Sequence, residues 1–182
     1  MERARLGVSP RQARNQASRR RSLWEQEFGR AALIRADSDC CRRVIKSYRL
    51  MLRFYGLELV DERTGAVRRD AEVGDAQLQN FNLSAHNWLR ISRIITSLGE
   101  LGFRRYKAPF LRQLRAEIDN GSLANAAQSY EQYWAPLVTG ESEGWYADKT
   151  LEEPSDREEC VLFKEGGALW TADGGEAPVG PA

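Results

Sequence analysis

Few side chains in this sequence have the type and spacing that chemistry requires. His86 is the only histidine, and the cysteines are Cys40, Cys41 and Cys160. A zinc or non-haem iron site is usually marked by spacings such as C-x-x-C or H-x-x-x-H, and neither occurs. A serine triad would need His86 as its base, yet the sequence has no nucleophile elbow of the G-x-S-x-G type. The sequence therefore predicts a protein that is not an enzyme, with no catalytic residue, metal or cofactor.

The cysteines and the acidic pairs give weaker signals of the same kind. Cys40 and Cys41 open a predicted helix, where the helix N-terminus lowers a thiol pKa, but small residues at the edge of a core are the simpler interpretation. An odd number of cysteines with two adjacent members is a poor disulfide framework, so we expect a reducing compartment. Glu152-Glu153 and Glu158-Glu159 lie in an acidic stretch, where we interpret them as solvated charges.

Basic side chains offer a different chemistry, the binding of anions. At ~100° per residue, four of them fall within about 60° of each other on one predicted helix, opposite its apolar stripe. These four residues are Arg42, Lys46, Arg49 and Arg53. If two helices adjoin, they could form one phosphate-binding patch with Arg90, Arg93, Arg104, Arg105 and Lys107. A solvated outer face is the plainer interpretation of the same pattern, and both stay open.

The distribution of charge divides the chain into three parts. Residues 1–22 carry seven arginines and one glutamate, whereas residues 139–182 carry three basic and eleven acidic side chains. We expect a basic arm with a short helix over 1–35, a helical domain over 36–138, and an acidic, largely disordered tail over 139–182. The tail still holds aromatic residues such as Phe163, so parts of it are candidates for docking on the body or on a partner. No apolar run is long enough for a transmembrane helix or a secretory signal, which predicts a chain that is not secreted.

Helical periodicity and end signals predict the elements that position these residues. Asp37 or Asp39 can cap the basic helix, whose apolar stripe ends before Gly56. Ser84 precedes the next strong helix, and Gly99 closes it. The apolar positions of these two helices are Val44, Tyr48, Met51, Leu52, Tyr55, Trp88, Ile91, Ile94, Ile95 and Leu98.

Two further helices are expected in the second half of the body. Pro109 suits the first position of a helix that ends at residues 120–121, and a last helix is stopped by Pro136. Between the basic helix and Ser84, the alternation after Gly56 is too short to predict a sheet, and residues 66–80 read as loop. The predicted fold class is therefore all-α, an irregular bundle of four to five helices.

Three segments of the body resemble a known family. They are residues 47–65 (SYRLMLRFYGLELVDERTG), residues 81–102 (FNLSAHNWLRISRIITSLGELG) and residues 108–111 (APFL). Their order and spacing are similar to the conserved domain of the opioid growth factor receptor family, over about residues 36–138. The upstream part of that domain, with a Trp-Leu-Phe-Pro motif, has no match, so we interpret the chain as cut short on its N-terminal side.

The resemblance implies a signalling or regulatory receptor that binds opioid peptides such as Met-enkephalin and restrains cell growth. It also implies association with the nucleus, the cytoplasm and, peripherally, the nuclear envelope membrane. From the matching segments we predict ligand contacts by an arginine that meets a peptide carboxylate and by aromatic rings. The predicted ligand-binding residues are His86, Asn87, Arg90, Arg93, Tyr55 and Trp88. The alternatives are a nucleic-acid-associated nuclear protein that uses the basic helical face, and a non-catalytic scaffold for protein partners.

Overall fold

The basic helix predicted from periodicity forms the longest element of the structure, which is a computed structural model that describes residues 29–139, 159–164 and 166–169. Residues 29–36 are helical, and α2 follows as Ser38–Phe54. Asp37 caps α2, because its carboxylate accepts a hydrogen bond from the Cys40 N–H at 2.7 Å. Gly56 lies just beyond the helix end with a φ of 79°, as the sequence predicted for a terminating glycine.

A small hairpin follows α2 and corrects the expectation that no sheet forms. Strand β1 (Leu57–Asp61) pairs antiparallel with β2 (Ala66–Arg69). In the turn, the Asp61 carboxylate accepts hydrogen bonds from the Arg63 N–H at 2.8 Å and the Thr64 hydroxyl at 2.6 Å. A two-stranded hairpin is marginal by itself, so its packing against α2 and α5 explains why local sequence signals did not predict it.

The segment expected to be loop, residues 66–80, contains β2 and most of helix α3 (Gly74–Leu83). The Asp70 carboxylate prepares the start of α3 by accepting hydrogen bonds from the Glu72 and Val73 N–H groups, at 2.8 and 3.1 Å. Leu78 and Phe81 are almost completely buried, and they hold this short, mostly polar helix against the core. The prediction of loop over 66–80 was wrong because tertiary burial of two residues outweighed a polar local sequence.

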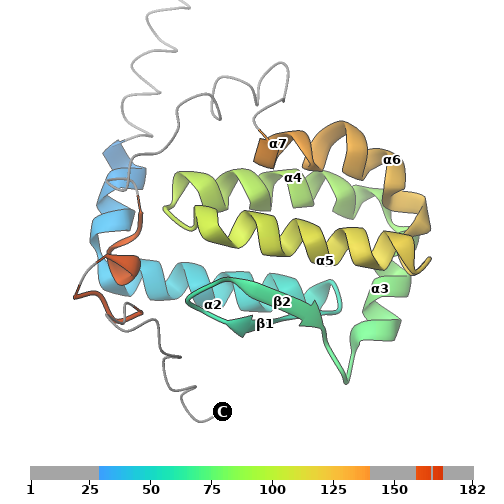
Figure 1. Cartoon of the computed structure of the whole chain (residues 1–182), viewed down its shortest axis with the longest axis horizontal. Coiled ribbons are helices and arrows are strands. Elements are labelled where there is room, and N and C mark those ends of the chain that lie inside the picture. The colour runs from blue at the N-terminus through green and yellow to red at the C-terminus, as the bar shows by residue number, and fades with distance from the viewer. Residues whose placement is uncertain (1–28, 140–158, 165, 170–182) are drawn as a thin grey trace, which may run out of the picture.

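Helices α4 (Ala85–Glu100) and α5 (Lys107–Asp119) lie side by side in the centre of the molecule (Figure 1). The buried apolar residues of α4, which are Ile91, Ile95 and Leu98, lie on its predicted stripe, whereas the buried Asn87 and Ser92 do not. In α5 the buried apolar residues are Phe110, Leu111 and Leu114. The predicted end of α4 at Gly99 was wrong, since the helix runs on to Glu100 and Gly102 adopts the positive φ of 82°. Residues 120–121 terminate α5 as predicted, with Gly121 at a φ of 89°.

The last part of the body is less regular than the single helix predicted from the sequence. It begins with a 3-10 turn (Ala124–Ala126) and a short α6 (Ala127–Ser129). A π-helical turn (Tyr130–Trp134) follows, in which the Ala135 N–H reaches the Tyr130 carbonyl at 2.9 Å. Pro136 does not stop a helix here: it begins α7 (Pro136–Thr139), where a missing N–H costs nothing.

Part of the region expected to be an acidic tail packs onto the body. A 3-10 turn (Val161–Phe163) lies against the N-terminal half of α2 (Figure 1). Cys160, Leu162 and Phe163 are buried there, and the Cys160 N–H donates to the Gly102 carbonyl at 3.1 Å. We call residues 159–164 and 166–169 the C-terminal segment. The dominance of helix confirms the predicted fold class, with the hairpin and this segment added to it.

Aromatic rings fill the core where the elements meet. Tyr48 of α2 contacts the Tyr106 ring with a centroid separation of 5.5 Å, and Phe163 of the C-terminal segment lies 5.8 Å from the same ring. At the other end of α2, the Tyr55 and Phe81 rings are 4.7 Å apart. None of the described helices is both long enough and apolar enough to cross a bilayer.

Candidate ligand-binding site

Helix α4 carries five of the six residues predicted to contact a ligand, all except Tyr55. His86 is exposed in the first turn of α4, and its imidazole makes no hydrogen bond with a described residue. Arg93 is exposed one turn further along than Arg90. Asn87 is 5% exposed, and its side-chain oxygen accepts a hydrogen bond from Arg90 Nη1 at 3.4 Å. Asn87 and Arg90 therefore form a pair, whereas His86 and Arg93 face solvent separately.

The phenol of Tyr55 adjoins this pair. The ring is completely buried, and the hydroxyl has no hydrogen-bond partner within the described part of the chain. Burial raises the pKa of Tyr55, and the nearby Arg90 guanidinium opposes that rise. The structure thus brings Tyr55, Asn87 and Arg90 together, although Tyr55 presents almost no surface to a ligand.

Trp88 is half-buried and connects neighbouring elements instead of facing solvent. Its indole N–H donates to the Phe81 carbonyl at 3.2 Å, so it ties α4 to the end of α3. The Trp88 carbonyl accepts a hydrogen bond from Trp134 Nε1, also at 3.2 Å, which links α4 to the π-helical turn. Both tryptophans therefore join α4 to other elements of the fold.

The basic face of α2, defined by Arg42, Lys46, Arg49 and Arg53, is largely neutralised by neighbouring carboxylates. Arg42 pairs with Asp39 at 2.9 Å and Arg53 with Glu72 at 2.9 Å. Arg49 pairs with Glu62 of the hairpin turn at 2.7 Å. The Lys46 ammonium makes no ion pair with any described residue. The hairpin and the loop before α3 supply two of these carboxylates, a compensation that helical periodicity alone did not reveal.

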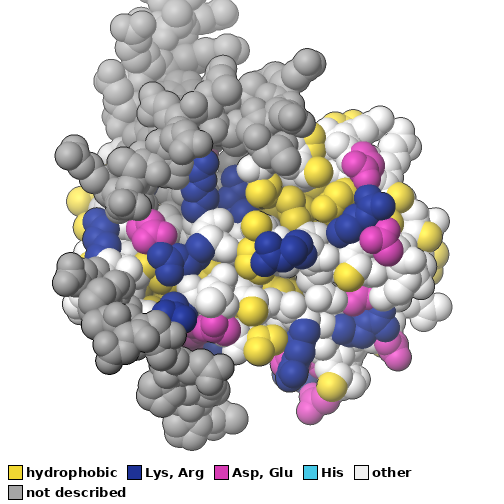
Figure 2. Space-filling view, in the orientation of Figure 1, with side chains coloured by type: hydrophobic (Ala, Val, Ile, Leu, Met, Phe, Trp, Pro, Cys, Tyr) yellow, Lys and Arg dark blue, Asp and Glu magenta, His cyan; other side chains and the backbone are white. Residues whose placement is uncertain are grey.

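The wider basic patch envisaged from the sequence does not form. Lys107 is 7% exposed, and its ammonium donates to the Leu137 carbonyl at 2.5 Å. Burial, assisted by the charge of Arg104, lowers the pKa of Lys107 to about 8. Arg105 is held by Glu159 at 2.7 Å. On the face drawn in Figure 2, basic side chains alternate with acidic and apolar ones, which is unlike the continuous positive surface of a dedicated nucleic-acid binder.

A hollow of about 280 Å³ lies between the basic face of α2 and the C-terminal segment. Arg42, Lys46 and Arg49 form its charged side, together with Glu62. Its apolar side consists of Ile45, Leu162, Ala168 and Leu169. Cations beside an apolar wall suit a ligand that carries a negative charge next to a hydrocarbon group.

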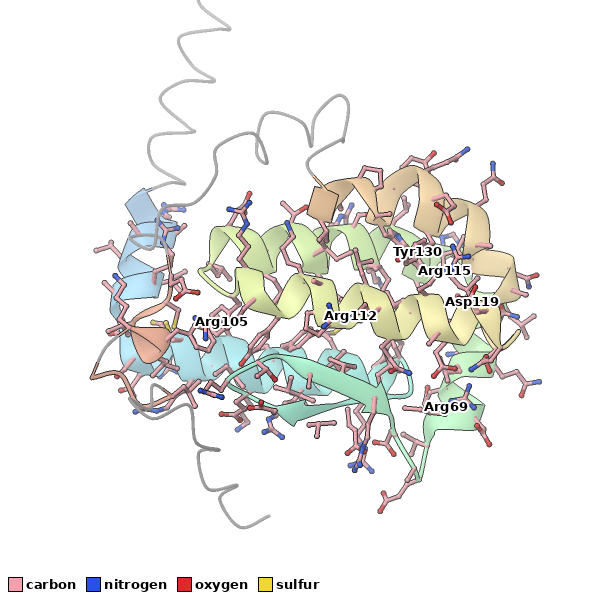
Figure 3. The ribbon with its side chains drawn as sticks, in the orientation of Figure 1. Arg69, Arg105, Arg112, Arg115, Asp119 and Tyr130 are labelled. Carbon is pink, nitrogen blue, oxygen red and sulfur yellow. The ribbon has the colours of Figure 1, made fainter. Side chains whose placement is uncertain are left out.

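Arg105 fixes the wall of this hollow, at the end of the molecule where the C-terminal segment crosses α2 (Figure 3). Its guanidinium makes a bidentate contact with the Glu159 carboxylate, at 2.7 and 2.8 Å from Nη2. It also lies 4.2 Å above the centre of the Phe163 ring. Burial raises the pKa of the neighbouring Cys160 thiol to about 12. The C-terminal segment, which forms this wall, is therefore held by the Arg105–Glu159 ion pair and by the contact of Arg105 with the Phe163 ring.

Sequence reasoning identified the basic side of the hollow but not the hollow itself. Apart from Ile45 of α2 itself, its apolar side comes from residues more than a hundred positions further along the chain than α2. The one available signal was the apolar run Val161-Leu162-Phe163 inside an acidic stretch. Among the described residues, no group of three or more His, Cys, Asp or Glu side chains could hold a metal ion, and the described cysteines are free.

Fold and site together define a mostly helical domain with a small charged hollow beside a basic helix. The chain belongs to the opioid growth factor receptor family: the model of the "Opioid growth factor receptor (OGFr) conserved region" matches residues 20–144. The match starts earlier than residue 36, where the resemblance was expected to begin, so residues 20–35 of the supposed arm are part of the matched region.

Similarity to individual relatives covers about half of the chain. The chain is 45% identical over 78 residues to the opioid growth factor receptor of Mus musculus, or 43% of this chain and 12% of that protein. It is 42% identical over 80 residues to the Homo sapiens receptor, or 44% of this chain and 12% of that protein. It is 37% identical over 101 residues to opioid growth factor receptor-like protein 1 of Mus musculus, or 55% of this chain and 21% of that protein. The chain thus spans about an eighth to a fifth of the length of these curated relatives. No solved structure matches it.

Proposed function

We propose that this chain is a non-catalytic receptor domain that binds an enkephalin-type peptide, or a protein partner, and thereby restrains cell growth. The observation that carries the proposal is the family match over residues 20–144, together with relatives whose name is opioid growth factor receptor. The hollow beside α2 supports it, because it offers a small peptide both charge and apolar surface.

Direct titration tests the proposal. Fluorescence anisotropy of labelled Met-enkephalin is measured against increasing concentrations of the chain, with a scrambled peptide of the same composition as the control. Circular dichroism of the same sample verifies that the protein is helical. Saturable binding of the true peptide alone is the expected result. A helical sample that binds neither peptide, or both equally, would remove the opioid ligand and leave a domain for protein partners.

Association with nucleic acid has less support than peptide binding. Three of the four side chains on the basic face already have a carboxylate partner. A nucleic-acid binder would need to break those pairs, and its affinity would fall steeply with salt. Titration of the chain with labelled duplex DNA at two salt concentrations separates this alternative from the peptide receptor.

For localisation we propose the nucleus and cytoplasm, with peripheral attachment at the nuclear envelope. The support is family membership and the basic triplet Arg19-Arg20-Arg21, which has the composition of an import signal. Microscopy of a fluorescent fusion tests it: nuclear enrichment that is lost when the triplet is changed to alanine is expected, and exclusion from the nucleus would contradict the proposal.

A further inference from the structure

The hollow beside α2 has an excess of positive charge on its lining. Among the described residues that line it, Arg42, Lys46 and Arg49 face a single carboxylate, that of Glu62, which is engaged by Arg49 at 2.7 Å. The carboxylate that pairs with Arg42, Asp39, is 80% exposed, so water competes strongly for that interaction. The Lys46 ammonium has no anionic partner among the described residues. One added negative charge would therefore meet Lys46 directly and could recruit Arg42.

The opposite side of the hollow is apolar and suits a hydrocarbon group of a ligand. Leu162 is 3% exposed and Ile45 is 4% exposed, so both are firm parts of the core. Leu169 is packed against the core only in part, and its main-chain N–H is fixed by the Leu162 carbonyl at 2.9 Å. This side offers hydrocarbon contact and, through these side chains, no hydrogen bond. A ligand group that satisfies both sides must carry an anion and a hydrocarbon within the span of one residue.

The size of the hollow limits what enters it. A volume of about 280 Å³ lies just below the range of small-molecule sites, roughly 300–1,000 Å³. It suits one amino-acid residue and not a whole peptide. An aspartate or glutamate side chain would bring the charge but leave the leucines uncovered. The last residue of a peptide brings both groups together, since its α-carboxylate lies next to its own side chain.

We propose that this hollow binds the C-terminal residue of a peptide that ends in an apolar side chain with a free α-carboxylate. The inference deepens the proposed function and rests on it, because it states which end of the peptide the receptor domain binds. Lys46 receives the carboxylate, with Arg42 beside it. Leu162 and Leu169 cover the terminal side chain.

Titration of paired peptides tests the assignment on the full chain. Met-enkephalin with a free carboxylate is compared with the same peptide as its C-terminal amide, by anisotropy competition. We expect the amide to bind about 10- to 100-fold more weakly, as for the loss of a charged hydrogen-bonding group. Lys46→Gln should reduce the affinity for the free acid and leave that for the amide nearly unchanged. The control is Arg112→Gln, which removes an equal charge from an exposed position on α5 that does not line the hollow.

A second measurement tests the site in the hollow independently of whether enkephalin binds. Methyl NMR spectra of the chain are recorded with N-acetyl-methionine and with its amide, which carry the terminal residue alone. Shifts of the Leu162, Leu169 and Ile45 methyl groups with the acid only, absent in Lys46→Gln, support the site even if enkephalin itself does not bind. Equal binding of acid and amide peptides overturns the assignment but not the proposed function. Absence of methyl shifts, or a concentration-dependent dimer that Lys46→Gln abolishes, also overturns it, because a second copy would then cover the hollow.

Discussion

The tight approach of the hairpin turn to Tyr106 gives a sharp test of the fold that carries the hollow. Gly65 ends the turn with a φ of 74° and is buried. A β-carbon added there would lie 2.7 Å from the Tyr106 α-carbon and 2.8 Å from its Cγ. The Tyr106 hydroxyl donates to the Glu62 carbonyl in the same turn, so the ring is fixed and cannot easily withdraw. Gly65→Ala therefore combines an unfavourable backbone conformation with a steric overlap.

The two costs can be separated with a matched control. Gly121 has a similar φ of 89°, but nothing lies within 4 Å of an added β-carbon. An L-residue in the left-handed region costs about 1–2 kcal/mol, and overpacking a dense core adds roughly 1–3 kcal/mol. Gly121→Ala should thus lose about 1–2 kcal/mol of unfolding free energy, and Gly65→Ala about 2–5 kcal/mol by the same figures.

Urea unfolding followed by circular dichroism measures both variants. Because a small domain is stable by only about 5–15 kcal/mol, the upper part of the range for Gly65→Ala approaches complete unfolding. The midpoint should fall clearly further for Gly65→Ala than for Gly121→Ala, with an unchanged slope for Gly121→Ala. Equal losses in the two variants would refute the reasoning, because the turn would then not press on Tyr106.

Three other predictions concern buried charges and the C-terminal segment. Glu117→Gln should cost about 3 kcal/mol, near the lower end for a broken buried pair, because Arg69, its partner, is 35% exposed (Figure 3). Burial tends to raise the pKa of Glu117, but hydrogen bonds from Arg69 and neighbouring amides lower it below 4.5, so its contribution is present above pH 4.5 and lost in acid. As the pH is lowered from 7 to 3, the urea midpoint should therefore fall less steeply in Glu117→Gln than in the unchanged chain. Burial lowers the pKa of Lys107 from its ordinary value of 10.5 to about 8 in the folded chain. The free energy of unfolding should therefore rise as the pH rises from 8 to 10, and the same rise in Lys107→Met would disprove this. Arg105→Ala should release the C-terminal segment and speed maleimide labelling of Cys160, located by peptide mass spectrometry, while Arg112→Ala should not; unchanged protection would show that Arg105 is not the anchor.

The sequence by itself determined the long helices and most of their ends. Capping by Asp37 and termination at Gly56 and Gly121 depend on hydrogen bonds and backbone angles within a few residues, so local signals suffice. The apolar stripes of α2, α4 and α5 likewise follow from a period of 3.6 residues. The family resemblance also lay in the sequence, and the match over 20–144 confirms it.

Only the tertiary structure decided the elements whose stability comes from distant contacts. The strand β2 and the helix α3 are polar segments that form because a few residues, such as Phe81, are buried by other parts of the chain. The same holds for the C-terminal segment, which an acidic composition predicted as tail and which Arg105 and the aromatic core hold in place.

The candidate site shows the same division between local and distant information. Periodicity placed Arg42, Lys46 and Arg49 on one face of α2, because that depends on helix geometry alone. The Arg42–Asp39 pair lies within the helix, but the neutralisation of Arg49 and the apolar wall beside Lys46 depend on the hairpin and on Leu162, Ala168 and Leu169. The hairpin and the C-terminal segment are brought to α2 by packing of the whole chain, and no spacing within the helix carries that part of the information.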